Sequence, residues 1–567
     1  MKGQLIAWLS LILIASVVLS GCNSKANNAA SSTAPPATKA ASAAPSASAS
    51  AAENVAGTLP IVAEKTTITV MTRGVPQVDS FLYEDNAFTQ WLEEQTNIHI
   101  EWEVVPNESA TQKLNVTLAS GKLPDVILGF NISPSVQEIY GKQGLFVPLN
   151  AYIDKLGVET KKLFEAMPEA KDLVTMPDGN IYSLPSVQTC FHCTAPYKMY
   201  INQKWLDQLN LKMPTTTEEF ENVLKAFKTQ DPNGNNKADE LPLAAIKNNG
   251  NIATVNMFET YLMNPFIYHS DNREFVNQDH KIDVIFNKPE WKQGLEYAHR
   301  LYTEGLIAPE SFTQDRNQMK TQFNREDAAT IGAFPAIAPS QIADLAQTRW
   351  QDYAAVPPLK GPNGVQYASY SPYQGIASGA ALITNHAQDP EIIFRLLDFM
   401  FNPEVSLRSL YGVKGQDWDT ADAGTIGIDG QPALYKTMNY LSTGAAKSNS
   451  WNGVTLAWNP FHDKFATEQG VPNQEFVLYD ATVKYLEHKP DMSMITPPLV
   501  YDQDQAAELA TLEKSILDYV FDSYARFVIG EKDTDKDWDA YVTQLEKMNL
   551  ARYLEIQQQT YDKKYKK

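Results

Sequence analysis

The pattern of apolar and polar positions predicts alternating strands and helices from residue 66 onward. Residues 66–72 form a β-branched run typical of a strand, and residues 98–104 alternate in the same way. Amphipathic helices are expected to begin at Phe88 and Gln112, and residues 124–129 read as a short buried strand. This order of strand, helix, strand, helix and strand predicts a parallel, doubly wound sheet.

Later segments also show helical periodicity. Thr215 and Thr216 each stand three residues before a Glu, which is the spacing of a capping box. Apolar residues recur at i, i+3, i+4 and i+7 in 220–227 and again in 393–400, and a long helix is expected over 502–529. The fold class indicated is therefore α/β.

The first 60 residues have the pattern of a secretion signal followed by a tether. Lys2 precedes an apolar run from Leu5 to Leu19, which has the length of a secretory h-region rather than of a membrane span. The stretch Leu-Ser-Gly-Cys at 19–22 resembles a bacterial lipobox, which implies removal of a signal peptide, residues 1–21, and lipidation of Cys22. A plain signal peptide followed by a chance Cys is the alternative.

Residues 22–59 consist mostly of Ala, Ser, Pro, Asn and Thr, with no aromatic residue. Such a segment cannot bury enough apolar surface to fold, so we expect a disordered tether. A flexible chain of this length spans roughly 30–35 Å. Two or more acyl chains anchor a protein stably, so we expect the protein on the outer face of the cell membrane, in contact with lipid through this anchor only.

Composition narrows the class of partner. The 567 residues include 47 Lys and Arg against 67 Asp and Glu, a formal net charge of −20. Binding of nucleic acid is not expected, because neutralising phosphates needs clustered Lys and Arg. Three Cys do not make a disulfide framework, and a chain of this length buries enough surface without one.

A candidate calcium loop occupies residues 231–242. Side-chain oxygens recur at its positions 1, 3, 5 and 9, and position 7 offers a carbonyl, as in an EF-hand. Asn236 replaces the usual Gly and Pro242 the usual Glu, but Glu240 can supply the bidentate carboxylate. The expected ligands of a structural Ca²⁺ are Asp231, Asn233, Asn235, Lys237, Asp239 and Glu240. An Asx-rich turn without metal is the alternative.

Seven stretches, in this order and after the lipobox, carry a resemblance to a known family. They are LASGKLPDVI (118–127), GLFVPLNAYIDK (144–155), DGNIYSLP (178–185), INQKWLDQLNLKMPTTTEEF (201–220), YTEGLIAPESF (302–312), YGVKGQDW (411–418) and FVIGEKDTDKDWDAYVTQLEKMNLARYLEIQQQTYD (527–562). The chain resembles extracellular solute-binding proteins of bacterial ABC importers, in the large lipoprotein subgroup associated with oligosaccharide uptake. Calcium-binding members of that family carry the loop variant described above.

The resemblance implies a two-lobed, periplasmic-binding-protein-like fold of type II, with the ligand cleft between the lobes. We expect the first lobe in 60–188 and 366–430, and the second in 189–365 and 431–567. The implied function is to capture a carbohydrate, expected to be an oligosaccharide, and to deliver it to ABC permease subunits. A monomer without enzymatic activity is expected.

Two other functions stay open. A glycoside hydrolase needs only two carboxylates, which the chain has in plenty, although it lacks the G-x-S-x-G, H-E-x-x-H and P-loop motifs. A sensory or adhesive lipoprotein with the same fold is the other alternative.

Cys190 and Cys193 form a Cys-x-x-Cys pair with His192 inside it. A disulfide suits an extracytoplasmic compartment and is the favoured interpretation. Free or transiently oxidised thiols are a second interpretation. A metal or redox-catalytic site is a third, but zinc would need two further ligands and no second Cys-x-x-Cys exists. The pair lies where the chain is expected first to cross between lobes.

Candidate ligand contacts are polar or aromatic residues expected at the carboxyl ends of strands or where the chain crosses between lobes. Sugar rings stack on aromatic faces, while their hydroxyls need hydrogen-bonding side chains. The candidates are Arg73, Asp79, Tyr83, Asn131, Tyr370, Tyr373, Gln374, Trp418, Trp451 and Trp458. For each of them, packing without ligand contact is the alternative.

Overall fold

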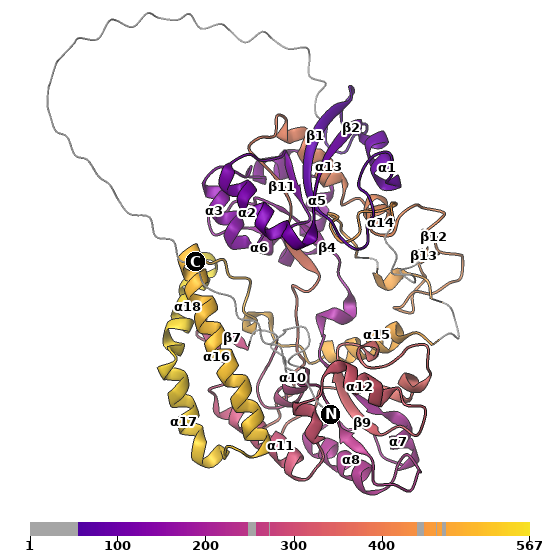
Figure 1. The fold of residues 1–567 in the computed structure, drawn as a ribbon, viewed down its shortest axis with the longest axis vertical. Coiled ribbons are helices and arrows are strands. Elements are labelled where there is room, and N and C mark those ends of the chain that lie inside the picture. The colour runs from indigo at the N-terminus through magenta and orange to yellow at the C-terminus, as the bar shows by residue number, and fades with distance from the viewer. Residues whose placement is uncertain are drawn as a thin grey trace, which may run out of the picture. The chain divides into compact units, whose positions relative to one another are not determined.

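The computed structural model describes residues 55–247, 257–270, 273–438, 447–460, 462–467 and 472–566. The predicted signal peptide, the predicted lipidation site Cys22 and nearly all of the predicted tether lie outside these ranges. Among the described residues, no helix is long and apolar enough to cross a membrane. Two main sheets, each with its own helices, organise the described chain (Figure 1).

The first sheet has five strands in the order β2-β1-β3-β11-β4. Their bounds are Thr66–Arg73 for β1, Ile98–Val105 for β2, Val126–Leu128 for β3, Leu184–Val187 for β4 and Ile376–Ile383 for β11. β1 runs parallel to both β2 and β3, as the alternation predicts. The expectation of a wholly parallel sheet is wrong, because β11 returns from the second lobe and pairs antiparallel with β3 and β4.

Successive residues of the first sheet face two helical layers. Val70 belongs to a core that includes Leu92 of α1 and Ile393 of α13, whereas Met71 belongs to a core with Leu114 of α2. This alternation is the period of two that a strand imposes. The helices of this lobe are α1 (Ala87–Thr96), α2 (Ala110–Ser120), α3 (Pro134–Lys142), α4 (Asn150–Leu156), α5 (Glu159–Ala166), α6 (Pro168–Val174), α13 (Pro390–Phe399) and α14 (Pro403–Tyr411).

The second sheet has four strands in the order β10-β5-β9-β6. Their bounds are Lys198–Asn202 for β5, Leu241–Leu243 for β6, Ile331–Ala336 for β9 and Tyr353–Val356 for β10. The accompanying helices are α7 (Gln203–Gln208), α8 (Thr217–Thr229), α10 (Met257–Met263), α11 (Pro289–Thr303), α12 (Arg316–Phe323) and α15 (Gln474–Leu486). All five residues of β5 are buried, so this strand lies at the centre of the second lobe.

Three C-terminal helices complete the second lobe (yellow in Figure 1). They are α16 (Gln503–Ile529), α17 (Thr534–Lys547) and α18 (Leu550–Tyr565). Ile516, Tyr541 and Ile556 from these helices share a buried core with Trp291 of α11. Two small hairpins, β7 (Glu274–Val276) with β8 (Ile282–Val284) and β12 (Trp418–Thr420) with β13 (Tyr435–Thr437), lie outside the main sheets.

The start of α8 shows how local sequence sets a boundary. The Thr216 hydroxyl accepts a hydrogen bond from the Glu219 backbone N–H at 3.1 Å, and the Glu219 carboxylate accepts from both the backbone and the hydroxyl of Thr215. These bonds satisfy N–H groups that a helix terminus otherwise leaves unpaired. Of the two possible capping positions, the structure uses Thr216.

The chain enters the described structure against the first lobe. The guanidinium of Arg395, in α13, donates to the carbonyl of Ile61 at 2.8 Å and to that of Thr58 at 3.0 Å. Hydrogen bonds to a charged donor are among the stronger ones in proteins. The segment before β1 is therefore fastened to α13.

The predicted lobe boundary is wrong for residues 447–459. Trp451, Val454 and Leu456 belong to the core of the first lobe, although 431–567 was assigned to the second. The Trp451 ring makes edge contacts with Phe88 at 4.8 Å and with Trp102 at 4.9 Å. The segment packs large apolar side chains into the core of the first lobe. Their burial is favourable, so the segment belongs to this lobe although it lies late in the sequence.

Candidate functional site

Three segments of the chain meet where the two lobes join, and we call this region the crossover, residues 187–189, 375–376 and 457–459. The Gln188 N–H donates to the Gly375 carbonyl at 2.8 Å, the Val187 N–H donates to Ala457 at 2.7 Å, and the Asn459 N–H donates to Val187 at 2.8 Å. Gly375 has φ +82°, and a Cβ there would lie 2.6 Å from the Gln188 carbonyl oxygen. The close approach therefore requires glycine at 375.

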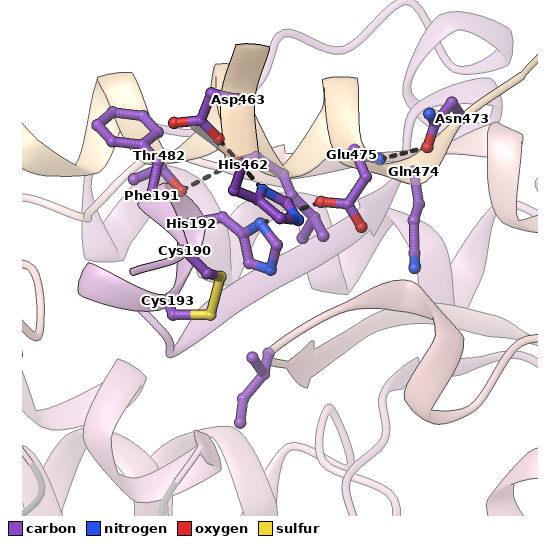
Figure 2. Close-up of polar contacts among 12 residues, drawn as sticks. Cys190, Phe191, His192, Cys193, His462, Asp463, Asn473, Gln474, Glu475 and Thr482 are labelled. Carbon is purple, nitrogen blue, oxygen red and sulfur yellow. Dashed lines mark hydrogen bonds and ion pairs between the residues drawn. A yellow bond between two sulfur atoms is a disulfide. The ribbon is translucent and has the colours of Figure 1, made fainter. Parts of the chain in front are cut away.

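The Cys-x-x-Cys pair directly follows the first crossover strand. The structure contains a disulfide between Cys190 and Cys193, the favoured interpretation of the pair (Figure 2). The ring of Phe191, inside this loop, packs on Tyr479 of α15 with centroids 4.7 Å apart. The loop is thus held against the second lobe by an aromatic contact.

His192 of the disulfide loop lies in a cluster with His462, Glu475 and Asp463 (Figure 2). His192 Nδ1 lies 3.2 Å from Glu475 Oε2, and His462 Nδ1 lies 3.4 Å from Asp463 Oδ1. The two imidazole centroids are 6.1 Å apart. Three distant stretches of sequence therefore contribute to one polar cluster.

The charges of this cluster support one another. Burial alone would raise the pKa of Glu475, but the hydrogen bond from His192 and the positive charges of His192 and His462 outweigh it and lower that pKa. The hydrogen bond to Asp463 raises the pKa of His462 against the opposing effect of burial, with a further contribution from Glu475. These shifts favour ion pairs within the cluster.

Lys198 holds the backbone of the disulfide loop through hydrogen bonds. Its side chain is completely buried, and its Nζ donates to the carbonyl of His192 at 3.1 Å and to the carbonyl of Ala195. Burial lowers the pKa of Lys198 from 10.5 to about 7, because the charged form loses its hydration. A neutral amine has two N–H groups, which match the two carbonyls.

Arg73, a predicted ligand contact, instead joins three loops of the first lobe. Its Nε donates to the Gly129 carbonyl at 2.7 Å, its Nη1 to Asn107 Oδ1 at 2.9 Å, and its Nη2 to the Gly453 carbonyl at 3.4 Å. From the carboxyl end of β1, the guanidinium thus holds the loops that follow β2 and β3 and the segment at Gly453. We assign it a positioning role.

Three other predicted contacts lie on the first lobe. Asp79 is exposed and lines a hollow of about 530 Å³ together with Ser80, Asn107 and Glu108. Asn131 is exposed with φ 51°, in the loop after β3. Tyr83 is half-buried, with Lys65 Nζ 5.4 Å from its ring centroid. Of the three, only Asp79 borders this hollow.

Four predicted contacts lie at or beside the crossover. Tyr370, Tyr373 and Trp458 are half-buried and Gln374 is exposed. Trp458 pairs with Val187 as an isolated bridge, directly beside the segment that carries Tyr373 and Gln374. Burial and the nearby Asp172 and Glu169 raise the pKa of Tyr373, so its hydroxyl stays protonated. Backbone pairing thus places the segments that carry these predicted residues next to one another.

Trp418 and Trp451, two of the predicted contacts, are core residues. Trp418 is 1% exposed and its indole N–H donates to the Gly412 carbonyl at 3.0 Å. Trp451 is 3% exposed and its indole N–H donates to the Thr89 hydroxyl at 2.9 Å. Their indoles are fully partnered inside the first lobe, so neither is available to a ligand.

The predicted calcium loop has the curvature of a cation site. The Asp231 carboxylate accepts from the backbone of Asn235 and Asn236 at 3.2 and 2.9 Å, and the Asn235 side-chain oxygen accepts from Lys237 N at 2.7 Å. Asn236, which replaces the usual Gly, has φ 58°. Asn is the non-glycine residue that best tolerates this conformation, so the departure leaves the turn intact.

The loop also holds an uncompensated carboxylate. The buried Glu240 Oε1 has no hydrogen-bond partner among the described residues. Burial and the negative charges of Asp231 and Asp239 raise the pKa of Glu240. Side-chain amides of Asn233 and Asn235 donate to Asp239 at 3.1 and 3.0 Å. Hard oxygens with excess negative charge are the donor set that Ca²⁺ prefers, so the residues fit this ion.

Sequence reasoning missed the partners of the disulfide loop. Glu475, His462, Tyr479 and Lys198 have no spacing signal that links them to the Cys-x-x-Cys pair. Only Lys198 lies near it in sequence, and a Lys at the start of a buried strand is the one local sign of an unusual environment.

The family model for bacterial extracellular solute-binding proteins matches residues 77–406, more than half of the chain. The chain belongs to this family.

A curated relative extends the match. The fructooligosaccharide ABC transporter substrate-binding protein FusA of Streptococcus pneumoniae is 28% identical over 516 residues, covering 89% of this chain and 91% of FusA. This relative is a substrate-binding protein of an ABC transporter.

Two solved structures share the fold. An extracellular solute-binding protein from Bifidobacterium longum subsp. infantis is 25% identical with a TM-score of 0.73, covering 88% of this chain and 98% of its own. The S. pneumoniae FusA EF-hand mutant in complex with fructo-nystose is 27% identical with a TM-score of 0.63, covering 88% and 99%. The predicted two-lobed α/β fold of type II is thereby confirmed, and the chain is the substrate-binding component of an ABC importer.

The buried lysine predicts a pH dependence of stability. Between pH 7 and about 10 the unfolded chain holds a proton on Lys198 that the folded chain has lost, so stability rises with pH in this window. The unfolding free energy of the wild type minus that of Lys198→Met should rise by up to about 1.4 kcal/mol per pH unit. Urea unfolding at several pH values measures it. Lys514→Met, at an exposed site, should show no such slope, and a flat difference for Lys198→Met contradicts the prediction.

Proposed function

We propose that this protein is a membrane-anchored receptor that captures an oligosaccharide between its two lobes and delivers it to ABC permease subunits. The observation that carries the proposal is the group of partly exposed side chains at the crossover: Tyr370, Tyr373, Gln374 and Trp458. Aromatic faces and amide groups at the junction of two lobes suit sugar rings and their hydroxyls.

The relatives support a saccharide over other solutes. FusA is described as a fructooligosaccharide-binding protein, and its EF-hand mutant was solved with fructo-nystose. A chain with a net charge of −20 suits a neutral ligand better than an anionic one. We therefore propose that the ligand is a neutral oligosaccharide and that the protein binds it as a monomer at the outer face of the cell membrane.

Calorimetry with fructooligosaccharides tests this proposal. Reversible binding of one kestose or nystose per chain is expected, with no new reducing ends after long incubation. Tyr373→Ala should weaken binding at least tenfold, because it removes a stacking face from the crossover. Tyr302→Ala, on α11 in the second lobe, is the matched control and should bind normally.

Two outcomes contradict the proposal. Release of reducing sugars would favour the glycoside hydrolase. Unchanged affinity in both Tyr373→Ala and Trp458→Ala would place the ligand elsewhere. If a broader panel of neutral glycans binds and fructooligosaccharides do not, the class of ligand stands and its identity changes.

We further propose that the loop at 231–240 binds a structural Ca²⁺. Asp231, Asn233, Asn235, the Lys237 carbonyl, Asp239 and Glu240 would hold the ion, which would supply positive charge to three carboxylates. The buried and unpartnered Glu240 Oε1 supports this assignment. The FusA EF-hand mutant indicates a related loop in a family member.

Glu240→Gln should have opposite effects with and without calcium. Without calcium it should raise the melting temperature at neutral pH, because it removes a carboxylate whose ionised form is disfavoured by burial and by Asp231 and Asp239. With calcium it should lose most of the wild-type rise in melting temperature, as should Asp231→Ala. Asn236→Gly, which keeps the positive φ, is the control and should respond like wild type. An unchanged calcium response in Asp231→Ala would disprove the site.

The proposed anchor is Cys22, modified by lipid after removal of residues 1–21. In the native host, Cys22→Ser should move the protein from the membrane fraction to the culture medium and abolish its labelling by radioactive palmitate. Ser20→Ala, which keeps a small residue before Cys22, should leave both properties unchanged. Retention of Cys22→Ser on the membrane would contradict lipid anchoring.

A further inference from the structure

We propose that the disulfide loop becomes a transition-metal site when its disulfide is reduced. Cys190, Cys193 and His192 would be the ligands, and Glu475 would orient the histidine. The ion would be of the Zn²⁺ type, bound by two thiolates and one imidazole. The proposal is independent of the saccharide and of the calcium loop.

The three ligand atoms are already gathered. The Sγ atoms of Cys190 and Cys193 and an imidazole nitrogen of His192 all lie within 4.8 Å of one another. Zinc bound at about 2.1–2.3 Å in tetrahedral geometry separates its ligand atoms by roughly 3.5–4 Å. The loop would therefore need only a small adjustment once the S–S bond is broken. All three residues are partly exposed, so an ion has access from solvent.

Glu475 gives His192 the setting of a metal ligand. A metal-bound histidine usually donates its other ring N–H to a carboxylate, which fixes the tautomer and strengthens the ligand. His192 Nδ1 lies 3.2 Å from Glu475 Oε2, so Nε2 is the nitrogen that would face the metal (Figure 2). Lys198 adds a second constraint, because its bond to the His192 carbonyl holds the backbone of the loop.

His462 is the candidate for the fourth coordination position. The His462 imidazole centroid lies 6.1 Å from that of His192 and comes from the segment beyond the third crossover strand. It would supply the last ligand, with water as the occupant if the ring stays paired with Asp463. Glu475 and His462 could not be assigned to this site from the sequence, because they lie far along the chain from the Cys-x-x-Cys pair.

The chemistry balances with a phosphine as reductant. The phosphine transfers two electrons to the S–S bond and takes an oxygen from water, which leaves a phosphine oxide and two thiols. The metal then replaces the two thiol protons, which are released to solvent. In the oxidised protein no thiolate exists, so the same loop cannot bind the ion through sulfur.

The two metal sites of the chain differ in chemistry. The loop at 231–240 offers only oxygen ligands, which suit Ca²⁺, whereas sulfur and imidazole select zinc, cobalt or copper(I). Saturating calcium therefore blocks the first site without competing for the second.

Cobalt(II) titration tests the proposal. The full-length Cys22→Ser protein is titrated in excess calcium, before reduction and after anaerobic reduction and removal of the phosphine. The reduced protein should bind one cobalt per chain with thiolate-to-cobalt charge-transfer absorption, and zinc should displace it. The oxidised protein should show no such band. Reduced protein whose thiols are capped with iodoacetamide should also show none.

Variants assign the ligands. Cys193→Ser should lose the charge-transfer band, and Glu475→Gln should keep it with cobalt affinity about 10–100-fold weaker. His99→Gln, whose imidazole pairs with Glu93 in the first lobe, is the control and should match the parent. Absence of the band in the reduced parent protein, or its persistence after capping, would overturn the proposal whatever the variants do.

Discussion

The crossover depends on a few backbone hydrogen bonds between strands that are far apart in sequence. Each lobe is assembled from separate stretches of chain, and residues 187–189, 375–376 and 457–459 lie side by side where the lobes join. There Val187 and Gln188 pair with both neighbouring strands, and Gly375 lets two backbones approach closely. Lobes joined in this way can rotate about a narrow set of dihedral angles while each core stays intact. A receptor that closes on its ligand needs this combination.

A second contact between the lobes lies near Tyr373, beside the crossover, and involves charged groups. Lys564 and Tyr565, at the end of α18, both bond to Asp172 of α6, with Tyr565 Oη 2.9 Å from Asp172 Oδ2. The Lys564 side chain is only 10% exposed, so the cost of removing its charge from water offsets much of the attraction to Asp172. These bonds can therefore form and break as the lobes move, unlike the apolar cores on either side.

Local sequence pattern predicted the elements but not their long-range partners. The β-branched run of β1 and the caps of α8 are set by neighbours within a few residues, and these predictions are confirmed. β11 escaped prediction because its run of Ala and Gly has no strand signature, and its antiparallel pairing is decided by strands near residues 126 and 187. Trp418 and Trp451 were predicted as ligand contacts, yet both are buried by side chains that include residues remote in sequence. For the same reason, the contact between Glu475 and His192 could not be predicted from local sequence. By contrast, the proposed calcium loop is one short segment, so its candidate oxygen ligands follow from spacing within that segment.

The bonds from Arg395 to the carbonyls of Thr58 and Ile61 give the molecule a mechanical polarity. Any pull along the chain from its N-terminal side enters the folded protein at α13 and is carried by the first lobe. The second lobe is joined to the first through the crossover and through the contact of Lys564 and Tyr565 with Asp172. A chain that is held from this side is held by its first lobe, so any rotation about the crossover displaces the second lobe.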